Sequence, residues 1–206
     1  MLGMLVPRLY PILDADCFPD DNAMFAAAEE LASVGCTLMQ YRNKSRNARQ
    51  MLDHARELKR RVGGRVKLIM NDRADLCLAA DFDGVHVGQD DLSADSVRRI
   101  IGPNRWLGVS THNPEQLGEA DKTSADYLAI GPVFATSSKA NPDPVVGLER
   151  LRRARELTRK PLVAIGGITR ENARSVIDAG ADSVAVISDL LRDPRKSSEE
   201  FLRVLG

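Results

Sequence analysis

Residues 161–188, PLVAIGGITRENARSVIDAGADSVAVIS, contain one complete strand–helix–strand unit. The segment opens and closes with short apolar runs, PLVAIG and SVAVIS, that are typical of buried β-strands. Between these runs, Ala173, Val176 and Ile177 share one face at helical spacing, and Gly180 stands where that helix should end. Two strands joined through a helix predict a parallel pair with a crossover connection.

The same pattern repeats along the whole chain. Short apolar runs recur eight times, with helical patterns between them, at 8–13, 37–42, 67–71, 84–88, 106–110, 126–131, 161–166 and 183–188. No linker, low-complexity tract or shift in composition divides the 206 residues. Eight alternating strand and helix units predict an α/β fold with one domain over residues 1–206, a (β/α)8 TIM barrel around a parallel eight-stranded sheet.

An open, doubly wound sheet is the alternative, because it shows the same alternation of strands and helices. Such sheets usually bind a nucleotide at the point where the strand order reverses. Neither G-x-G-x-x-G nor G-x-x-x-x-G-K-[ST] occurs in the sequence, which weakens this alternative.

Composition narrows the possible partners. Lys plus Arg and Asp plus Glu number 29 each, so no net charge favours nucleic acid or an acidic membrane. No run of ~18 apolar residues could span a bilayer, and the N-terminus lacks the basic region of a signal peptide. Cys17, Cys36 and Cys77 show no C-x-x-C spacing and are expected to be small core residues of a reduced compartment. We expect a soluble cytoplasmic protein without nucleic-acid or membrane partners; the sequence carries no signal for its oligomeric state.

Polar side chains gather at the predicted carboxyl ends of the strands, where barrel enzymes place reactive groups. After the second strand, Gln40, Arg42 and Lys44 occupy every second position of QYRNK and therefore share one face. Such a charged end can also be a strand running into a solvated loop. That explanation would have to recur independently, because six strand ends carry groups able to hold a phosphate or a metal.

The segments AIGGIT and AVIS end the last two strands, where barrels commonly bind phosphate. Gly166 and Gly167 permit a close backbone approach, and Thr169 can open a helix whose free N–H groups attract an anion. A simple tight turn is the alternative. We expect a phosphorylated small molecule as substrate.

Asp72 and Asp91 stand at adjacent strand ends, and two carboxylates suit Mg²⁺, which takes its other oxygens from water and a substrate phosphate. Either residue could instead cap a helix. Lys139 lies in ATSSKANPDP, a loop that can fold over the barrel mouth beside Arg42 and Lys44, although a lysine there is usually solvated. Three cations and one Mg²⁺ suit a diphosphate, whose departure as a leaving group they would stabilise.

The sequence resembles thiamine phosphate synthases along almost the whole chain. The segments that carry the resemblance are LYPILD, QYRNK, NDRADL, ADFDGVHVGQDDL, LGVSTH, ADYLAIGPVFATSSK, PLVAIGGIT and AVIS. The resemblance implies a transferase that joins hydroxymethylpyrimidine diphosphate to hydroxyethylthiazole phosphate, plain or carboxylated, and releases thiamine phosphate and pyrophosphate. It also implies a dissociative mechanism, in which the diphosphate leaves before the thiazole nitrogen attacks. The sequence agrees, since it offers no convincing pair of nucleophile and base.

The resemblance further implies residue roles at the diphosphate and the metal. Asp72 and Asp91 would bind Mg²⁺. The diphosphate would be held by Arg42, Lys44, Asn71 and Lys139, which together with Ser110 are the expected catalytic residues.

Roles at the two rings follow in the same way. Gln40 and Ser110 would face the pyrimidine, while Tyr10 and His86 lie in matching motifs and are as often ordinary barrel residues. The thiazole phosphate would be surrounded by Thr136, Ser138, Gly167, Ile187 and Ser188.

Two other functions of the same barrel stay open. A thiazole tautomerase would keep the phosphate-binding segments but has no need of the cations and acids that suit a diphosphate. A non-catalytic phosphate-binding barrel would retain AIGGIT and AVIS and show no turnover.

Overall fold

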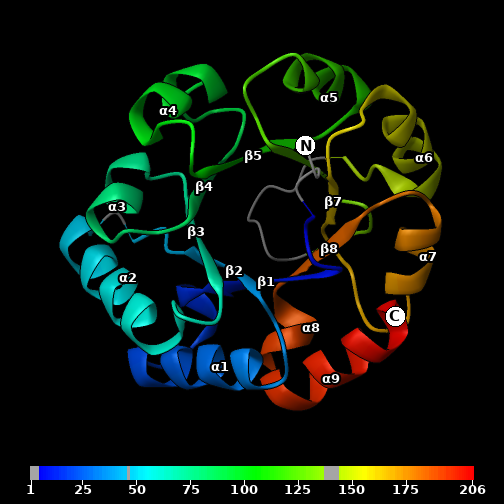
Figure 1. Ribbon diagram of the computed structural model, residues 1–206. Helices are drawn as coiled ribbons and strands as arrows, with labels where there is room; N and C mark the ends of the chain where they lie inside the picture. Colours follow the sequence, from blue (N-terminus) through cyan, green and yellow to red (C-terminus); the bar gives the residue numbers. More distant parts are fainter. Residues whose placement is uncertain (1–4, 46, 137–143) are drawn as a thin grey trace.

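Eight parallel strands close into one barrel in the order β1 to β8, and helices surround it (Figure 1). The computed structural model describes residues 5–45, 47–136 and 144–206. Each strand pairs with its neighbours in the sequence, and β8 pairs in parallel with β1. The predicted (β/α)8 barrel is therefore confirmed, and the open doubly wound sheet is wrong because a closed sheet has no point of strand-order reversal.

The elements follow the predicted pattern, with strand ends within two residues of those expected. The strands are β1 (Leu9–Asp14), β2 (Leu38–Arg42), β3 (Lys67–Asn71), β4 (Gly84–Val87), β5 (Trp106–Thr111), β6 (Tyr127–Ile130), β7 (Leu162–Ile165) and β8 (Ser183–Val186). The helices are η1 (Ala15–Cys17), α1 (Asp21–Ser33), α2 (Ala48–Val62), α3 (Ala74–Ala79), α4 (Ala94–Ile101), α5 (Pro114–Asp121), α6 (Gly147–Leu157), α7 (Ala173–Asp178), α8 (Ser188–Leu191) and α9 (Pro194–Leu205). Among the residues that the structure describes, none of these helices is long and apolar enough to cross a membrane.

Successive strand side chains enter two separate hydrophobic layers, as the alternation of a strand requires. In β2, Met39 and Tyr41 pack outward into the layer beneath the helices. The inner layer fills the barrel interior with Tyr10, Ile12, Leu38, Ile69, Tyr127, Ala129, Val163 and Ala185, together with Val6. The barrel is therefore a packed core rather than a channel, and its reactive groups lie above this layer.

The cysteines are divided between the core and the surface. Cys36 and Cys77 are buried, as expected, but Cys17 is exposed. The expectation of three core cysteines is wrong for Cys17 because it belongs to η1, a short turn that follows β1 outside both layers.

Three aspartates clamp neighbouring strands at the amino-terminal end of the barrel. Each directly precedes an even-numbered strand; its backbone N–H donates to a leucine carbonyl on the preceding strand, and its carboxylate accepts the N–H of the same leucine. The pairs are Asp83 with Leu68, Asp126 with Leu107, and Asp182 with Leu162. Because each aspartate holds both backbone groups of one residue, the clamp stabilises a single register between the two strands.

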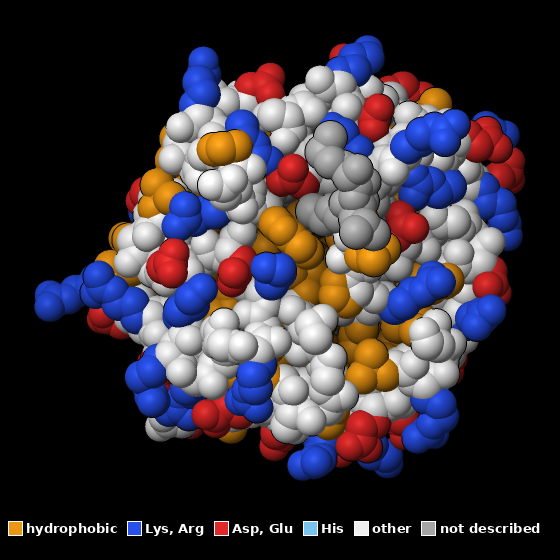
Figure 2. Space-filling view, viewed as in Figure 1, with side chains coloured by type: hydrophobic (Ala, Val, Ile, Leu, Met, Phe, Trp, Pro, Cys, Tyr) orange, Lys and Arg blue, Asp and Glu red, His pale blue; other side chains and the backbone are white. Residues whose placement is uncertain are grey.

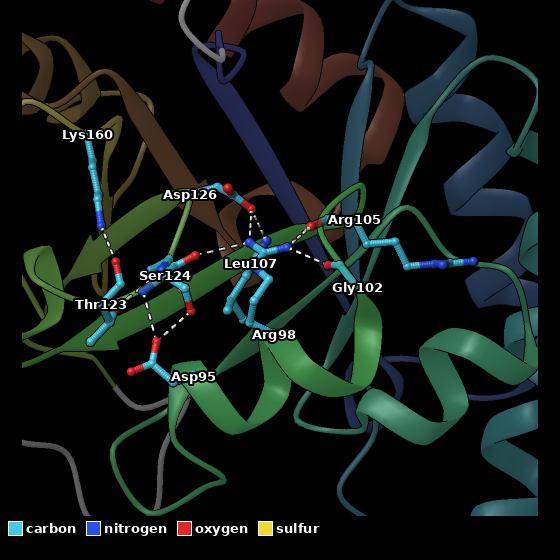
Figure 3. A network of polar contacts seen from close by, with 10 residues as sticks. Asp95, Arg98, Gly102, Arg105, Leu107, Thr123, Ser124, Asp126 and Lys160 are labelled. Carbon is cyan, nitrogen blue, oxygen red and sulfur yellow. Dashed lines mark hydrogen bonds and ion pairs between the residues drawn. The ribbon is translucent and has the colours of Figure 1, made fainter.

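Arg98 of α4 reinforces the middle clamp (Figure 3). Its guanidinium donates to the Asp126 carboxylate at 2.6 Å and to the carbonyl oxygens of Gly102, Arg105 and Ser124. One helix side chain thus ties the loop before β5 to the loop before β6.

The Asp126 clamp gives the first prediction. Asp126→Ala should lower the free energy of unfolding by about 1–3 kcal/mol, because the Leu107 N–H and Arg98 lose their shared acceptor. Urea denaturation measures the change. Asp53→Ala, on the exposed face of α2, is the control and should shift the free energy by less than about 0.5 kcal/mol. Equal effects at both positions would show that the clamp does not stabilise the fold.

Candidate active site

A cavity of about 330 Å³ opens at the carboxyl ends of the strands. Figure 2 shows this hollow with an apolar floor and charged side chains around its mouth. It brings together every described residue predicted for the site: Gln40, Arg42, Lys44, Asn71, Asp72, Asp91, Ser110, Thr136, Gly167, Ile187 and Ser188. Tyr10 and His86 line it as well. Ser138 and Lys139 lie outside the described residues.

The two cations of QYRNK are each paired with a carboxylate from a neighbouring strand end. Arg42 donates to Asp14, the residue opposite it in the register of β1 and β2. Lys44 places Nζ 2.5 Å from Oδ2 of Asp72, which directly follows β3. These pairs hold both cations at the mouth of the cavity, where a bound anion would compete with the carboxylates for them.

Asp14 is a part of the site that sequence reasoning missed. Its carboxylate is buried, and burial raises its pKa although the Arg42 guanidinium opposes the shift. The available signal was its position, since an aspartate ends the first strand and the first two strands are neighbours in a barrel. Asp14 therefore positions Arg42 from inside the rim.

Asp72 and Asp91 form a second acidic group at the mouth. The pKa of Asp72 is raised, chiefly by burial, with Lys44 opposing the shift and the nearby Asp91 carboxyl adding to it. Asp91 accepts a hydrogen bond from the backbone N–H of Gly88 at 2.8 Å. The helix-cap alternative is not supported for either residue, because α3 has no side-chain cap and Ser93 caps α4.

The acid pair suits a hard divalent cation. Within residues 5–45, 47–136 and 144–206 there is no cluster of three or more histidine, cysteine, aspartate or glutamate side chains that could hold a metal ion. Asp72 and Asp91 would thus supply only two carboxylates, and water and substrate oxygens would have to complete the shell. That division of ligands is the one Mg²⁺ commonly has, so the residues present fit this ion.

A chain of five polar side chains runs through the barrel interior beneath the charged mouth. Gln40 Nε2 donates to Tyr10 Oη at 3.1 Å, and Tyr10 Oη lies 3.0 Å from Tyr127 Oη. Tyr127 Oη lies 3.0 Å from His86 Nδ1, and His86 Nε2 lies 2.7 Å from Ser110 Oγ. Burial lowers the pKa of His86 to about 4, and the Asp91 charge opposes the shift. Burial also raises the pKa of both tyrosines, so the chain is uncharged at neutral pH.

The glycine pair after β7 forms a close backbone wall of the cavity. Gly166 and Gly167 have φ angles of 96° and 63°, in the left-handed region that glycine tolerates. A Cβ atom on Gly167 would lie 2.4 Å from the carbonyl oxygen of Ala135. Only glycine fits there, so the turn after β7 packs directly against the loop after β6 and forms the cavity wall beside Ile187 and Ser188.

The expectation that Thr169 opens a helix is wrong. Helix α7 begins at Ala173, and the backbone N–H of Thr169 donates to Oδ1 of Asn172 at 2.8 Å. The N–H of Thr169 is therefore already engaged and is not free to bind an anion.

Further polar residues of the lining hold the strand ends together. Gln89 Nε2 donates to the carbonyl oxygen of Ser110 at 2.6 Å, and Thr111 Oγ1 donates to that of Ala129 at 2.8 Å. His112 Nδ1 lies 2.8 Å from the carbonyl oxygen of Gly131 and donates to it. Their position at strand ends was visible in the sequence, but their backbone partners were not.

The buried Asp14 carboxylate predicts a pH dependence of stability. A raised pKa in the folded state means that the folded protein binds more protons than the unfolded chain, so stability falls as pH rises from the unfolded pKa through the folded one. Asp14→Asn removes this effect. The free energy of unfolding of the wild type minus that of Asp14→Asn should therefore decrease with rising pH, as measured by urea denaturation from about pH 2.5 to pH 8, a range that lies on both sides of the unfolded pKa of an aspartate.

Asp75→Asn is the control for this measurement. Its partner Arg73 lowers the pKa of Asp75, so this carboxylate stabilises the fold above its unfolded pKa, and the effect is lost as pH falls. The corresponding difference should increase with pH. Curves of the same direction for both variants would contradict the assignment of Asp14.

Comparison with known proteins places the chain in a family. The sequence model of the thiamine monophosphate synthase family matches residues 9–190. The chain is 64% identical to the thiamine-phosphate synthase of Koribacter versatilis over 206 residues, covering 98% of both chains. It is 46% identical to that of Chloroflexus aurantiacus, covering 88% of this chain and 83% of the relative. The solved thiamine phosphate pyrophosphorylase of Pyrococcus furiosus superposes with a TM-score of 0.85 at 35% identity, covering 96% and 95% of the two chains. The chain belongs to the thiamine monophosphate synthase family.

Proposed function

We infer that the protein is a transferase that makes thiamine phosphate. In this reaction the hydroxymethylpyrimidine group passes from its diphosphate to hydroxyethylthiazole phosphate, and pyrophosphate is released. The chain belongs to the thiamine monophosphate synthase family, and one cavity is lined by its paired cations, its acid pair and its glycine pair. This combination is the observation that carries the inference. Two phosphorylated substrates need two anion sites within reach of one another, and the cavity supplies candidates for both.

The diphosphate is proposed to lie at the mouth, against Arg42, Lys44, Asn71 and Lys139. Arg42 and Lys44 are held there by their carboxylate partners. Asn71 adds an amide whose nitrogen Nδ2 is buried without a hydrogen-bond partner among the described residues. As the carbon–oxygen bond breaks, negative charge grows on the leaving diphosphate. Preorganised donors lower the barrier because they bind the diphosphate more strongly in the transition state than in the ground state.

Mg²⁺ is proposed to bind at Asp72 and Asp91, next to the diphosphate. When bound, the ion would neutralise part of the charge of the leaving group. Burial is the main cause of the raised pKa of Asp72, and the nearby Asp91 carboxyl adds to it, so the two acids disfavour each other's ionised form. Asp72 and Asp91 would hold the ion, whose charge would relieve this repulsion, and Lys44 would then be available to the substrate.

The remaining groups are proposed to position the two rings. Gln40 and Ser110 face the pyrimidine above the uncharged chain of the barrel interior. The thiazole phosphate lies at the other side of the cavity, near Thr136, Ser138, Gly167, Ile187 and Ser188. The dissociative mechanism needs no protein nucleophile, because the pyrimidine itself stabilises the cation until the thiazole nitrogen captures it.

The charged groups of the cavity also distinguish the transferase from a thiazole tautomerase. A thiazole tautomerase has no need of the Arg42 and Lys44 cations, and it has no need of the acid pair. Their presence in one cavity with the glycine pair supports the transferase.

We further propose that residues 1–206 act as one catalytic domain in the cytoplasm, since the proposed substrates are small phosphorylated metabolites and need no partner macromolecule.

One experiment separates the three functions. The purified protein is incubated with both substrates and Mg²⁺, and thiamine phosphate and pyrophosphate are assayed. We expect equal amounts of the two products. Conversion of the thiazole phosphate alone would favour the tautomerase, and a folded protein without turnover would favour the binding barrel.

Loss of a mouth cation should slow the chemical step. Arg42→Ala and Lys139→Ala should each lower kcat on the order of 10²-fold or more, because each removes a donor that stabilises the leaving diphosphate. Steady-state kinetics measures the change. Arg56→Ala, on the exposed face of α2, is the matched control and should keep full activity. Full turnover in both mouth variants would contradict the proposed diphosphate site.

The acid pair predicts a metal dependence. Asp91→Asn should raise the Mg²⁺ concentration needed for half-maximal activity by about tenfold or more, as loss of a metal-site group typically does. The readout is a Mg²⁺ titration of the initial rate. Asp53→Asn, on the exposed face of α2, is the control. An unchanged Mg²⁺ requirement in Asp91→Asn would remove Asp91 from the metal site.

A further inference from the structure

Tyr127 contacts His86 across a strand that lies between them. His86, Gly108 and Tyr127 stand in register on β4, β5 and β6. A Cβ atom on Gly108 would lie 2.1 Å from Cζ of Tyr127 and 2.3 Å from Nδ1 of His86. The missing side chain of Gly108 therefore makes the space in which the Tyr127 hydroxyl reaches the His86 ring.

Donor and acceptor capacity orients the whole chain of hydrogen bonds. Gln40 donates to the Tyr10 oxygen, so the single Tyr10 proton goes to Tyr127. Tyr127 then gives its own proton to His86 Nδ1. A ring that accepts at Nδ1 is neutral and carries its proton on Nε2, which donates to Ser110 Oγ.

The Ser110 hydroxyl therefore accepts a hydrogen bond from His86 Nε2, and its own proton can be donated to a group bound in the cavity. Ser110 lines the cavity, whereas Tyr127 lies beneath the lining and is fully buried. The reverse orientation would need the Gln40 amide oxygen to face Tyr10. Ser110 would then donate to His86 and could only accept from a substrate.

We propose that Tyr127 and Gly108 position the His86 ring so that Ser110 is a hydrogen-bond donor, which selects a substrate ring presenting an unprotonated acceptor at that point. The inference rests on the proposed function and deepens it. An aminopyrimidine offers both kinds of edge, since its ring nitrogens accept and its exocyclic amine donates. The chain of hydrogen bonds thus determines which edge of the ring faces Ser110. Tyr127 is a positioning residue, because it acts through His86 and Ser110.

The tautomer of His86 tests the orientation without any substrate. Nitrogen-15 NMR of the wild-type protein at pH 7 should show His86 protonated at Nε2 and unprotonated at Nδ1. The sequence has three histidines, so His54→Gln and His112→Gln variants assign the signals. A proton on Nδ1 of His86 in the wild type would overturn the proposal, and this measurement holds whether or not the protein makes thiamine phosphate.

Tyr127→Phe tests the positioning role. The two His86 nitrogen shifts should move toward each other, because Nδ1 loses the donor that favours one tautomer. Tyr41→Phe is the matched control, since Tyr41 is also fully buried and its hydroxyl lies 2.9 Å from Nδ1 of His54. It should alter the His54 signals and leave those of His86 unchanged. Unaltered His86 signals in Tyr127→Phe would overturn the role of Tyr127.

A double-mutant cycle tests the path through Ser110. Tyr127→Phe should raise KM for the pyrimidine diphosphate roughly 3- to 10-fold, a range typical of one weakened hydrogen bond, and leave KM for the thiazole phosphate within about twofold. In the Ser110→Ala background it should add less than about twofold, because both changes remove the same interaction. Independent effects in the double variant would overturn the proposal.

The predicted acceptor can be located with substrate analogues. Each ring nitrogen of the pyrimidine diphosphate is replaced in turn by C–H, and inhibition constants are measured. One analogue should bind the wild type about tenfold more weakly than the parent compound, and Ser110→Ala should lose most of that discrimination. Equal discrimination by wild type and Ser110→Ala would overturn the choice of an acceptor at Ser110. Absence of turnover by the wild type would refute the proposed function and would leave the tautomer result standing.

Discussion

Closure of the parallel sheet is the constraint on which the rest of the structure depends. Each strand is hydrogen-bonded on both sides, so all eight carboxyl ends meet at one rim. Residues far apart in the sequence become neighbours through strand register alone, as Asp14 and Arg42 do across β1 and β2. The aspartate clamps hold this register at the opposite end, away from the charged groups of the rim.

The rim shows how the site keeps its charges in place before substrate arrives. Arg42 and Lys44 are each neutralised by a carboxylate, and those carboxylates are themselves destabilised by burial, as the raised pKa values of Asp14 and Asp72 show. Separating these pairs therefore costs little free energy, so they oppose the binding of an anion less than strongly favourable pairs would. A functional site that costs some stability in this way is common among enzymes.

The sequence was sufficient for the barrel and for which residues meet at its rim. The period of apolar runs predicted the strands, and motif position predicted the residues of the cavity. It was not sufficient for contacts that depend on three-dimensional register. Asp14 was missed because its partner is set by strand pairing, and Thr169 was misjudged because Asn172 occupies its N–H. Tyr127 was missed because the space at Gly108 is a property of three adjacent strands.

The charged mouth of the cavity and the uncharged hydrogen bonds beneath it match the two charges that develop in a dissociative reaction. Negative charge grows on the diphosphate, which the proposal places among the cations of the rim. Positive charge grows on the pyrimidine, which it places above the interior chain. A protonated His86 there would repel that charge, but burial lowers its pKa to about 4 and Tyr127 occupies Nδ1 as a donor. The same buried hydrogen bonds that orient Ser110 therefore also keep the barrel interior uncharged beneath a developing cation, so one arrangement serves both recognition and the stability of the intermediate.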